Sequence, residues 1–231
     1  MQKALERKTK AQAVRALELV RASVSETTSL GRISAQTDST PFRVLISTML
    51  SARTRDPVTE QVSARLFQRY KDARALSKAK KTDVKKLIKP ANFYATKATR
   101  IIKVAKIIDQ KYFGRVPENI GELLLLPGVG RKTANCVLVY AFGTPAIPVD
   151  VHVHRISNRI GLVETGSPEQ TETQLARTYN RKYWLAVNEL FVKFGQTICK
   201  PLVPQCGICS VRPLCNYYQS QVKRTKSVAS S

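Results

Sequence analysis

The chain has 231 residues, enough for one large domain or two small ones, and its 43% hydrophobic content predicts a globular protein and excludes a disordered one. Lys and Arg number 39 against 16 Asp and Glu, and the net charge of +23 indicates a polyanionic partner, most commonly nucleic acid. No stretch has the length of a transmembrane helix and nothing resembles a signal peptide. We therefore expect an intracellular protein without a membrane partner, cytoplasmic or nucleoid-associated in a prokaryote.

The N-terminal half carries the spacing of amphipathic helices. Residues 1–26 are expected to be helical, and the Ser- and Thr-rich residues 27–39 are expected to form a linker. Pro41 then begins a helix whose apolar residues recur at i, i+3, i+4, i+7 and i+8. Further helices are expected from Asp56, over about 72–78 and 82–88, and around 98–108 after a break at 90–94.

The segment Leu126–Asn135, with the sequence LPGVGRKTAN, is the most informative part of the chain. An apolar segment precedes it, and apolar residues at helical spacing follow it. The pattern predicts a helix, a tight turn built on Gly128 and Gly130, and a second helix. The two glycines allow a sharp turn and a close approach by another molecule. The backbone amides that open the second helix favour an anion such as a phosphate.

Lys132 falls in the first turn of that second helix. Cations are disfavoured at this end of a helix dipole, so the position favours a neutral and nucleophilic amine. A Gly-x-Gly turn by itself is more often structural. A phosphate-binding P-loop is excluded, because Arg131 separates Gly130 from Lys132 and the required spacing fails.

The C-terminal part continues the helical pattern. Asp150 stands at an N-cap position for a helix over about 151–160. An aspartate at such a position often serves as a helix cap and has no other function. Another helix begins after Ser167, and a last long one ends near Gly195. No window alternates with a period of two residues, so the expected fold is all-α with about ten or more helices. Residues 220–231 are basic and Ser-rich and are expected to be a disordered tail.

Four of the five cysteines, Cys199, Cys206, Cys209 and Cys215, form the pattern C-x6-C-x2-C-x5-C. In an intracellular protein such a cluster favours a metal site over disulfides. Four thiolates suit tetrahedral zinc or an iron–sulfur cluster. The frequency of structural zinc sites favours zinc, whereas the short interval between the ligand pairs is unlike an ordinary zinc ribbon. The spacing alone leaves both metals open.

Four segments together resemble the endonuclease III family of base-excision DNA glycosylases. They are Leu50-Ser51-Ala52 followed by Asp56, the segment 126–135, Val149–Val153 and the four cysteines. They occur in the family's order and at about its separations, over roughly residues 38–217. The hairpin with Asp150 is specific to the wider helix–hairpin–helix glycosylase superfamily. The cysteine spacing is specific to members that carry a [4Fe-4S] cluster, and it therefore implies that cofactor.

The resemblance also implies a domain organisation. The family fold has two helical domains with DNA in a central cleft between them. Here, residues 34–144 would form a six-helix barrel with the helix–hairpin–helix motif. Residues 1–33 and 145–219 would form a discontinuous domain with the iron–sulfur cluster loop, followed by the tail at 220–231. The implied partner is double-stranded DNA with damaged bases or abasic sites, bound by a monomer.

By the same resemblance, Lys132 is the nucleophile and Asp150 its essential carboxylate. A damaged base is unreachable inside the duplex and has to be flipped out. Arg53 and Phe93 occupy the family's gap-filling positions, and Arg53 departs from the expected glutamine. His152 matches a family histidine near the DNA. Gly128, Gly130 and Arg131 of the hairpin are also expected to contact the DNA.

The expected activity is that of a bifunctional DNA glycosylase and abasic-site lyase acting on damaged, oxidised pyrimidines. A mismatch-specific thymine or uracil DNA glycosylase of the same superfamily is the close alternative. An adenine glycosylase is disfavoured, because it would have a glutamate at the position of Ser47. A non-catalytic iron–sulfur DNA-binding protein is the alternative from another class, and the presence of both Lys132 and Asp150 argues against it.

Overall fold

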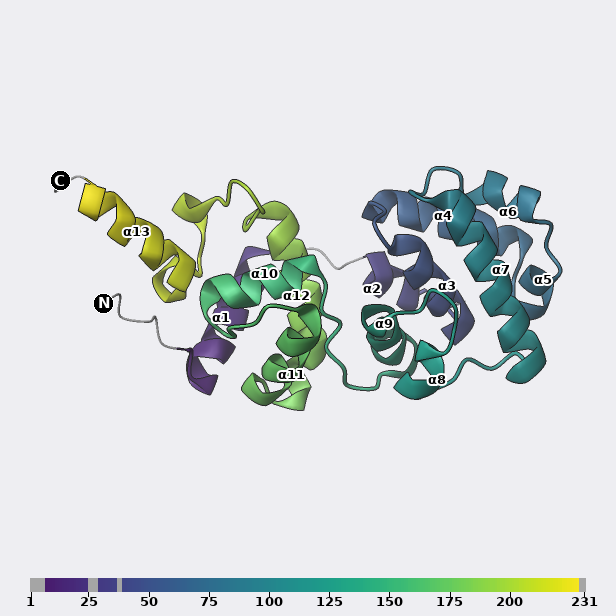
Figure 1. Ribbon diagram of the computed structural model, residues 1–231, viewed down its shortest axis with the longest axis horizontal. Coiled ribbons are helices and arrows are strands. Elements are labelled where there is room, and N and C mark those ends of the chain that lie inside the picture. Colours follow the sequence, from purple (N-terminus) through teal and green to yellow (C-terminus); the bar gives the residue numbers. More distant parts are fainter. Residues whose placement is uncertain (1–6, 25–28, 37–38, 229–231) are drawn as a thin grey trace. The chain divides into compact units, whose positions relative to one another are not determined.

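The computed structural model describes residues 7–24, 29–36 and 39–228 (Figure 1). Within these ranges the regular elements are all helices, which confirms the predicted all-α fold. None of the helices described there has the length and apolar character needed to cross a membrane. The α-helices in chain order are α1 Lys10–Ser23, α2 Ser29–Ser34, α3 Pro41–Ser51, α4 Asp56–Arg69, α5 Ala73–Ser77, α6 Lys81–Ile88, α7 Tyr94–Lys111, α8 Ile120–Leu124, α9 Arg131–Phe142, α10 Val151–Ile160, α11 Pro168–Thr178, α12 Trp184–Thr197 and α13 Asn216–Val228.

The chain divides into two compact units, and the first to be considered comprises residues 28–148. Its core is built around α3, which buries every residue from Val44 to Leu50. Helix α3 packs against α4 and α9, and α7 packs against α5 and α6 (Figure 1). The buried positions of α7, such as Ile101 and Ile108, follow the helical spacing that the sequence predicted.

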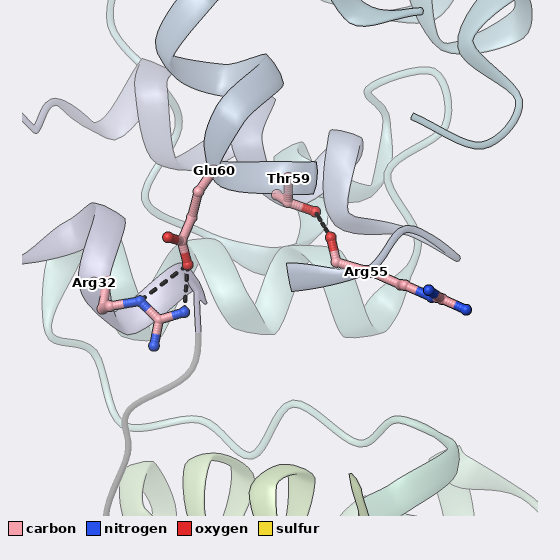
Figure 2. Close-up of polar contacts among 4 residues, drawn as sticks. All are labelled: Arg32, Arg55, Thr59 and Glu60. Atoms are coloured by element: carbon pink, nitrogen blue, oxygen red, sulfur yellow. Dashed lines mark hydrogen bonds and ion pairs between the residues drawn. The ribbon is translucent and has the colours of Figure 1, made fainter. Parts of the chain in front are cut away.

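Helix α2 belongs to this unit and lies where the sequence suggested a linker. The guanidinium of Arg32 pairs with the carboxylate of Glu60 on α4, and its Nε lies 2.9 Å from Glu60 Oε1 (Figure 2). Ile33 is buried beside α3 and α4. These contacts explain why α2 belongs to this unit. Residues 27–28 and 37–38 of the expected linker lie outside the described residues.

The other unit comprises residues 1–27 and 149–231, of which residues 1–6, 25–27 and 229–231 are not described. Helix α12 lies against α1 and α10, and α10 also contacts α11 and α13. The hydroxyl of Tyr179 donates to the carbonyl of Ala13, 2.9 Å away, and so joins the two separated pieces of chain. Tyr179 is buried, and burial raises its pKa well above the usual value.

Two expectations for this unit differ from the structure. Gly195 lies inside α12 and does not end it. A glycine is needed at this position because α12 approaches α10 closely there. A Cβ at Gly195 would lie 2.6 Å from His152 Nδ1 and 2.9 Å from Arg155 Nη2.

Helix α13 runs to Val228 in place of the tail expected from residue 220. Its first turn is fixed by Tyr217, whose ring lies 4.6 Å from the guanidinium of Arg159.

Candidate active site and cysteine cluster

The Gly-x-Gly turn joins α8 to α9, as the pattern predicted. Gly128 has a φ of 83°, which strongly favours glycine, and a Cβ there would lie 2.7 Å from Arg100 Cδ. Gly130 is the N-cap of α9 and has no side chain to cap the first turn. A Cβ at Gly130 would meet nothing within 4 Å, so the helix start is open to a partner. This geometry suits a phosphate held by backbone amides.

Lys132 is the second residue of α9 and is half-buried, whereas Arg131 beside it is exposed. The following residues, Ala134 and Asn135, are buried and hold the helix against α3. The side-chain amide of Asn135 donates to the backbone carbonyl of Ile147, 3.4 Å away. This bond connects the segment after α9 to the helix. Lys132 therefore lies on a rigid element. A group that has to be aligned with a substrate needs such a support.

Asp150 is the N-cap of α10 in the other unit. Its Oδ1 accepts hydrogen bonds from the amides of His152 at 2.8 Å and Val153 at 2.9 Å. The expected N-cap role is thus present. The second carboxylate oxygen, Oδ2, takes no part in these two bonds. The capping role therefore leaves Oδ2 available for chemistry.

The two histidines of α10 have separate environments. Nη2 of Arg155 lies 3.1 Å from Nδ1 of His152 and also donates to the carbonyls of Gly195 and Cys199. His154 Nδ1 lies 2.7 Å from the hydroxyl of Thr171 on α11. The two rings thus have different partners, in keeping with their spacing of two residues on a helix.

Arg53 and Phe93 lie together in the unit of residues 28–148. The Arg53 guanidinium is 5.9 Å from the centre of the Phe93 ring, and 61% of Phe93 is exposed. Both residues have left-handed backbones, with φ of 53° and 57°, a conformation that is unusual for large side chains. A hollow of about 330 Å³ beside them is also lined by Gly128 of the hairpin.

The four cysteines surround one hollow, together with residues of α10, α12 and α13. Nη1 of Arg159 lies 3.4 Å from the sulfur of Cys199, and the thiol of Cys215 lies 3.4 Å from the carbonyl of Arg159. Burial raises the pKa of the Cys206, Cys209 and Cys215 thiols. In the described residues no three Cys, His, Asp or Glu side chains form a group that could hold a metal ion.

Comparison with known proteins places this arrangement in a class. Residues 46–181 match the family model of the HhH-GPD superfamily of base excision DNA repair proteins. Endonuclease III of Thermotoga maritima is 50% identical over 183 residues, which are 79% of this chain and 86% of that protein. The solved structure of a trapped endonuclease III–DNA covalent intermediate has a TM-score of 0.82 and 32% identity, and covers 93% of this chain and 99% of its own. A thermostable thymine-DNA glycosylase has a TM-score of 0.77 and 26% identity, and covers 91% and 98%.

These matches define a base excision DNA repair protein with the helix–hairpin–helix fold. The chain belongs to the endonuclease III family of DNA glycosylases and abasic-site lyases. The resemblance found in the sequence is thereby confirmed.

Sequence reasoning missed three charged residues that the structure makes prominent: Lys97, Arg155 and Arg159. Lys97 is only 7% exposed, yet it lies on the apolar side of α7, next to Ala98 and four residues before Ile101. A lysine at such a position was a visible signal. Arg155 and Arg159 are spaced by four on α10, and nothing local in the sequence indicates that both point at the cysteine loop.

Proposed function

We propose that Lys132 is the nucleophile of this glycosylase and lyase, and that Asp150 assists it with proton transfer. The observation that carries the proposal is the position of Lys132, in the first turn of α9 directly after the Gly-x-Gly turn. The helix dipole at this end disfavours the charged amine and so favours the nucleophilic form. Arg131, its neighbour, acts in the same direction.

The reaction follows from the two groups. The neutral amine of Lys132 attacks C1′ of the damaged nucleotide, and the bond from C1′ to the base breaks. The departing base takes up a proton, the attacking amine loses one, and opening of the sugar gives a Schiff base. The imine makes the neighbouring C2′ proton acidic, so loss of that proton breaks the C3′–O bond and cuts the strand on the 3′ side. Oδ2 of Asp150 is the oxygen that we assign to these proton transfers.

We propose that the hairpin binds the DNA backbone. The amides around Gly128 and Gly130 and the side chain of Arg131 would hold phosphates, which position the duplex but carry no base information. Arg53 and Phe93 would enter the space left by the flipped base, and His152 would lie near the DNA. A protein with these roles acts where the cell's DNA is, hence our proposal of an intracellular location.

We assign a [4Fe-4S] cluster to Cys199, Cys206, Cys209 and Cys215. The four thiols around one hollow support this assignment, as does the hydrogen bond from Arg159 to Cys199, since donors to ligand sulfurs are typical of such sites. When bound, the cluster would organise a loop that has only short 3-10 turns of its own. The reaction at Lys132 needs no electron from it.

The test of the nucleophile is covalent trapping. Borohydride should reduce the Schiff base on an abasic duplex and leave a protein–DNA adduct that maps to Lys132. Lys132→Gln should lose trapping and strand cleavage but still bind the duplex, because the hairpin amides remain. If Lys132→Gln cuts abasic DNA as fast as the parent protein, the assignment is wrong.

The lesion is a separate question, with two candidates. The greater identity to endonuclease III favours oxidised pyrimidines, while the fold similarity to a thymine-DNA glycosylase keeps a thymine or uracil mismatch as the second candidate. A panel of duplexes, each with one lesion, separates them when base release and strand cleavage are scored independently. Release from an oxidised pyrimidine that exceeds release from a mismatch supports the first candidate, and the reverse order supports the second.

A further inference from the structure

The amine of Lys97 makes three short hydrogen bonds inside the unit of residues 28–148. Nζ donates to the carbonyl of Leu50 at 2.6 Å, to the carbonyl of Ala52 at 2.7 Å and to the hydroxyl of Thr54 at 2.7 Å. An ammonium has three protons and no acceptor, so these three partners use its whole capacity. Lys97 therefore connects the first turn of α7 to the C-terminal end of α3.

The end of α3 is a favourable place for this cation. The last carbonyls of a helix have no partners within it, and the helix dipole is negative there. Burial lowers the pKa of Lys97 to about 8, so at neutral pH most of the molecules keep the third proton that the third acceptor needs. At 7% exposure and with every proton engaged, this amine is unsuited to be a second nucleophile.

The residue that follows Ala52 is Arg53, whose left-handed backbone is strained for a residue with a side chain. Such a conformation persists only where surrounding contacts determine it. Lys97 holds the residues on both sides, Ala52 and Thr54, and Asn92 Nδ2 donates to the carbonyl of Arg53 at 2.6 Å. These contacts fix the Arg53 backbone from three directions.

Phe93 is tied to the same group of contacts. It is the left-handed residue just before α7, its carbonyl accepts from the amide of Lys97 at 3.0 Å, and its ring lies against the Arg53 guanidinium. Arg53, Phe93 and Lys97 also line the same hollow. The Lys97 ammonium thus holds the residues on both sides of Arg53, and the backbone amide of the same lysine is bonded to Phe93.

We propose that Lys97 is a positioning residue for gap filling: its ammonium fixes the backbone around Arg53, and through the contact between Arg53 and Phe93 it holds both side chains in the conformation in which they enter the duplex as the damaged base leaves the stack. This inference rests on the gap-filling role given to Arg53 and Phe93 under the proposed function. An ordered pair of side chains avoids the entropic cost of ordering them at the moment of binding. Lys97 therefore contributes to discrimination between damaged and intact DNA, and it touches no reacting atom.

The test compares Lys97→Met with Lys106→Met. Methionine keeps the apolar stem but removes the three donors, and Lys106 is an exposed lysine on the same helix. Two affinities are measured for each variant, one for an intact duplex and one for a duplex with an uncleavable tetrahydrofuran abasic site. Lys97→Met should lower the ratio of these affinities roughly tenfold, the cost of ordering about two side chains, and leave intact-duplex binding within about twofold. Lys106→Met should leave the ratio unchanged.

A double-mutant cycle distinguishes positioning from general stabilisation. If Lys97 acts through Phe93, the double variant Lys97→Met and Phe93→Ala should discriminate no worse than Phe93→Ala alone. The fluorescence of 2-aminopurine placed opposite the abasic site should fall in Lys97→Met, because the orphaned base restacks. Additive losses of discrimination in the cycle, or a Lys97→Met variant that melts earlier but keeps full discrimination, would overturn the proposal.

Thr54→Val provides the second route should Lys97→Met fail to fold. It removes one of the three acceptors and should lower the discrimination ratio by a smaller factor, again with no further loss on top of Phe93→Ala. An unchanged ratio in Thr54→Val then overturns the proposal. Failure of the proposed function gives a different result, since the parent protein itself would then neither prefer the abasic duplex nor form a borohydride adduct.

Discussion

Asp150 combines two roles that can be separated by substitution. Asparagine caps a helix about as well as aspartate, whereas alanine at an N-cap costs about 1 kcal/mol. Asp150→Asn should therefore keep the stability and DNA binding of the parent and lose most turnover, because the amide cannot carry the proton. Asp150→Ala should lose turnover and stability together, measured as cleavage rate and melting temperature.

Ser167 supplies the matched control for that comparison. It caps α11 in the same unit, with its hydroxyl accepting from the amide of Gln170 at 3.3 Å. Ser167→Ala should lower the melting temperature much as Asp150→Ala does while turnover remains. Full activity in Asp150→Asn would leave Asp150 with only a capping role.

The pKa of Lys97 gives a further prediction at this scale. The folded-state pKa of Lys97, about 8, lies below the usual lysine value of 10.5, because burial disfavours the charged form. The full stability cost of burying that charge therefore applies below pH 8. As the pH rises from about 8 towards 10.5, the folded state releases its proton first and this cost declines. The melting temperature of the parent, relative to that of Lys97→Met, should therefore rise across this window. A difference that stays constant would show that the amine titrates alike in both states.

Single residues also show how far sequence reasoning reached. Asp150 as an N-cap and Gly128 in the turn followed from local rules, because a cap and a turn are decided by adjacent residues. The partners of Lys97 lie 43 to 47 positions earlier in the chain. No local pattern specifies such a partner, although a lysine on an apolar helix face indicates that one exists.

At the scale of elements, the packing of α12 on α10 depends on Gly195. A methyl group there would displace Arg155, which donates to the carbonyls of Gly195 and Cys199. Gly195→Ala should therefore lower the melting temperature and the metal content of the purified protein. Gly207→Ala, in the cysteine loop itself, is the control, because a Cβ at Gly207 meets nothing within 4 Å. Equal metal content in the two variants would contradict this account.

The cysteine loop gives a second prediction at this scale. The purified protein should be brown and contain iron and sulfide in equal amounts, and Cys209→Ser should lower the soluble yield because the loop loses its organising group. Metal analysis of protein prepared without oxygen provides the measurement. One zinc and no iron would refute the cluster assignment.

Elements whose apolar spacing is strong were predicted well, and α2 and α13 were not. Helices α3 and α7 follow the spacing of their buried residues. Helix α2 has only six residues, and its position depends on the pair between Arg32 and Glu60 (Figure 2). Helix α13 is polar throughout most of its length, so composition alone suggested a tail. Tertiary contacts made by short or polar segments cannot be inferred from periodicity.

At the scale of the whole molecule, the net charge of +23 determines how binding responds to salt. Each phosphate that the protein neutralises releases a counterion, so the logarithm of the affinity falls linearly with the logarithm of salt concentration, by about 0.9 per phosphate. Binding to an intact duplex should therefore weaken steeply as salt increases. A slope near zero would contradict the idea that the excess charge contacts DNA.

The contribution of Arg131 can be separated from that of the net charge. We expect Arg131→Ala to weaken binding by a similar factor on every sequence and to reduce the salt slope by about 1, because it removes one phosphate contact without changing base readout. Arg74→Ala removes the same charge from an exposed position on α5 to which we assign no DNA contact. If long-range charge alone governs binding, both variants should lose the same affinity. If the hairpin grips phosphate directly, Arg131→Ala should change the slope and Arg74→Ala should leave it unchanged.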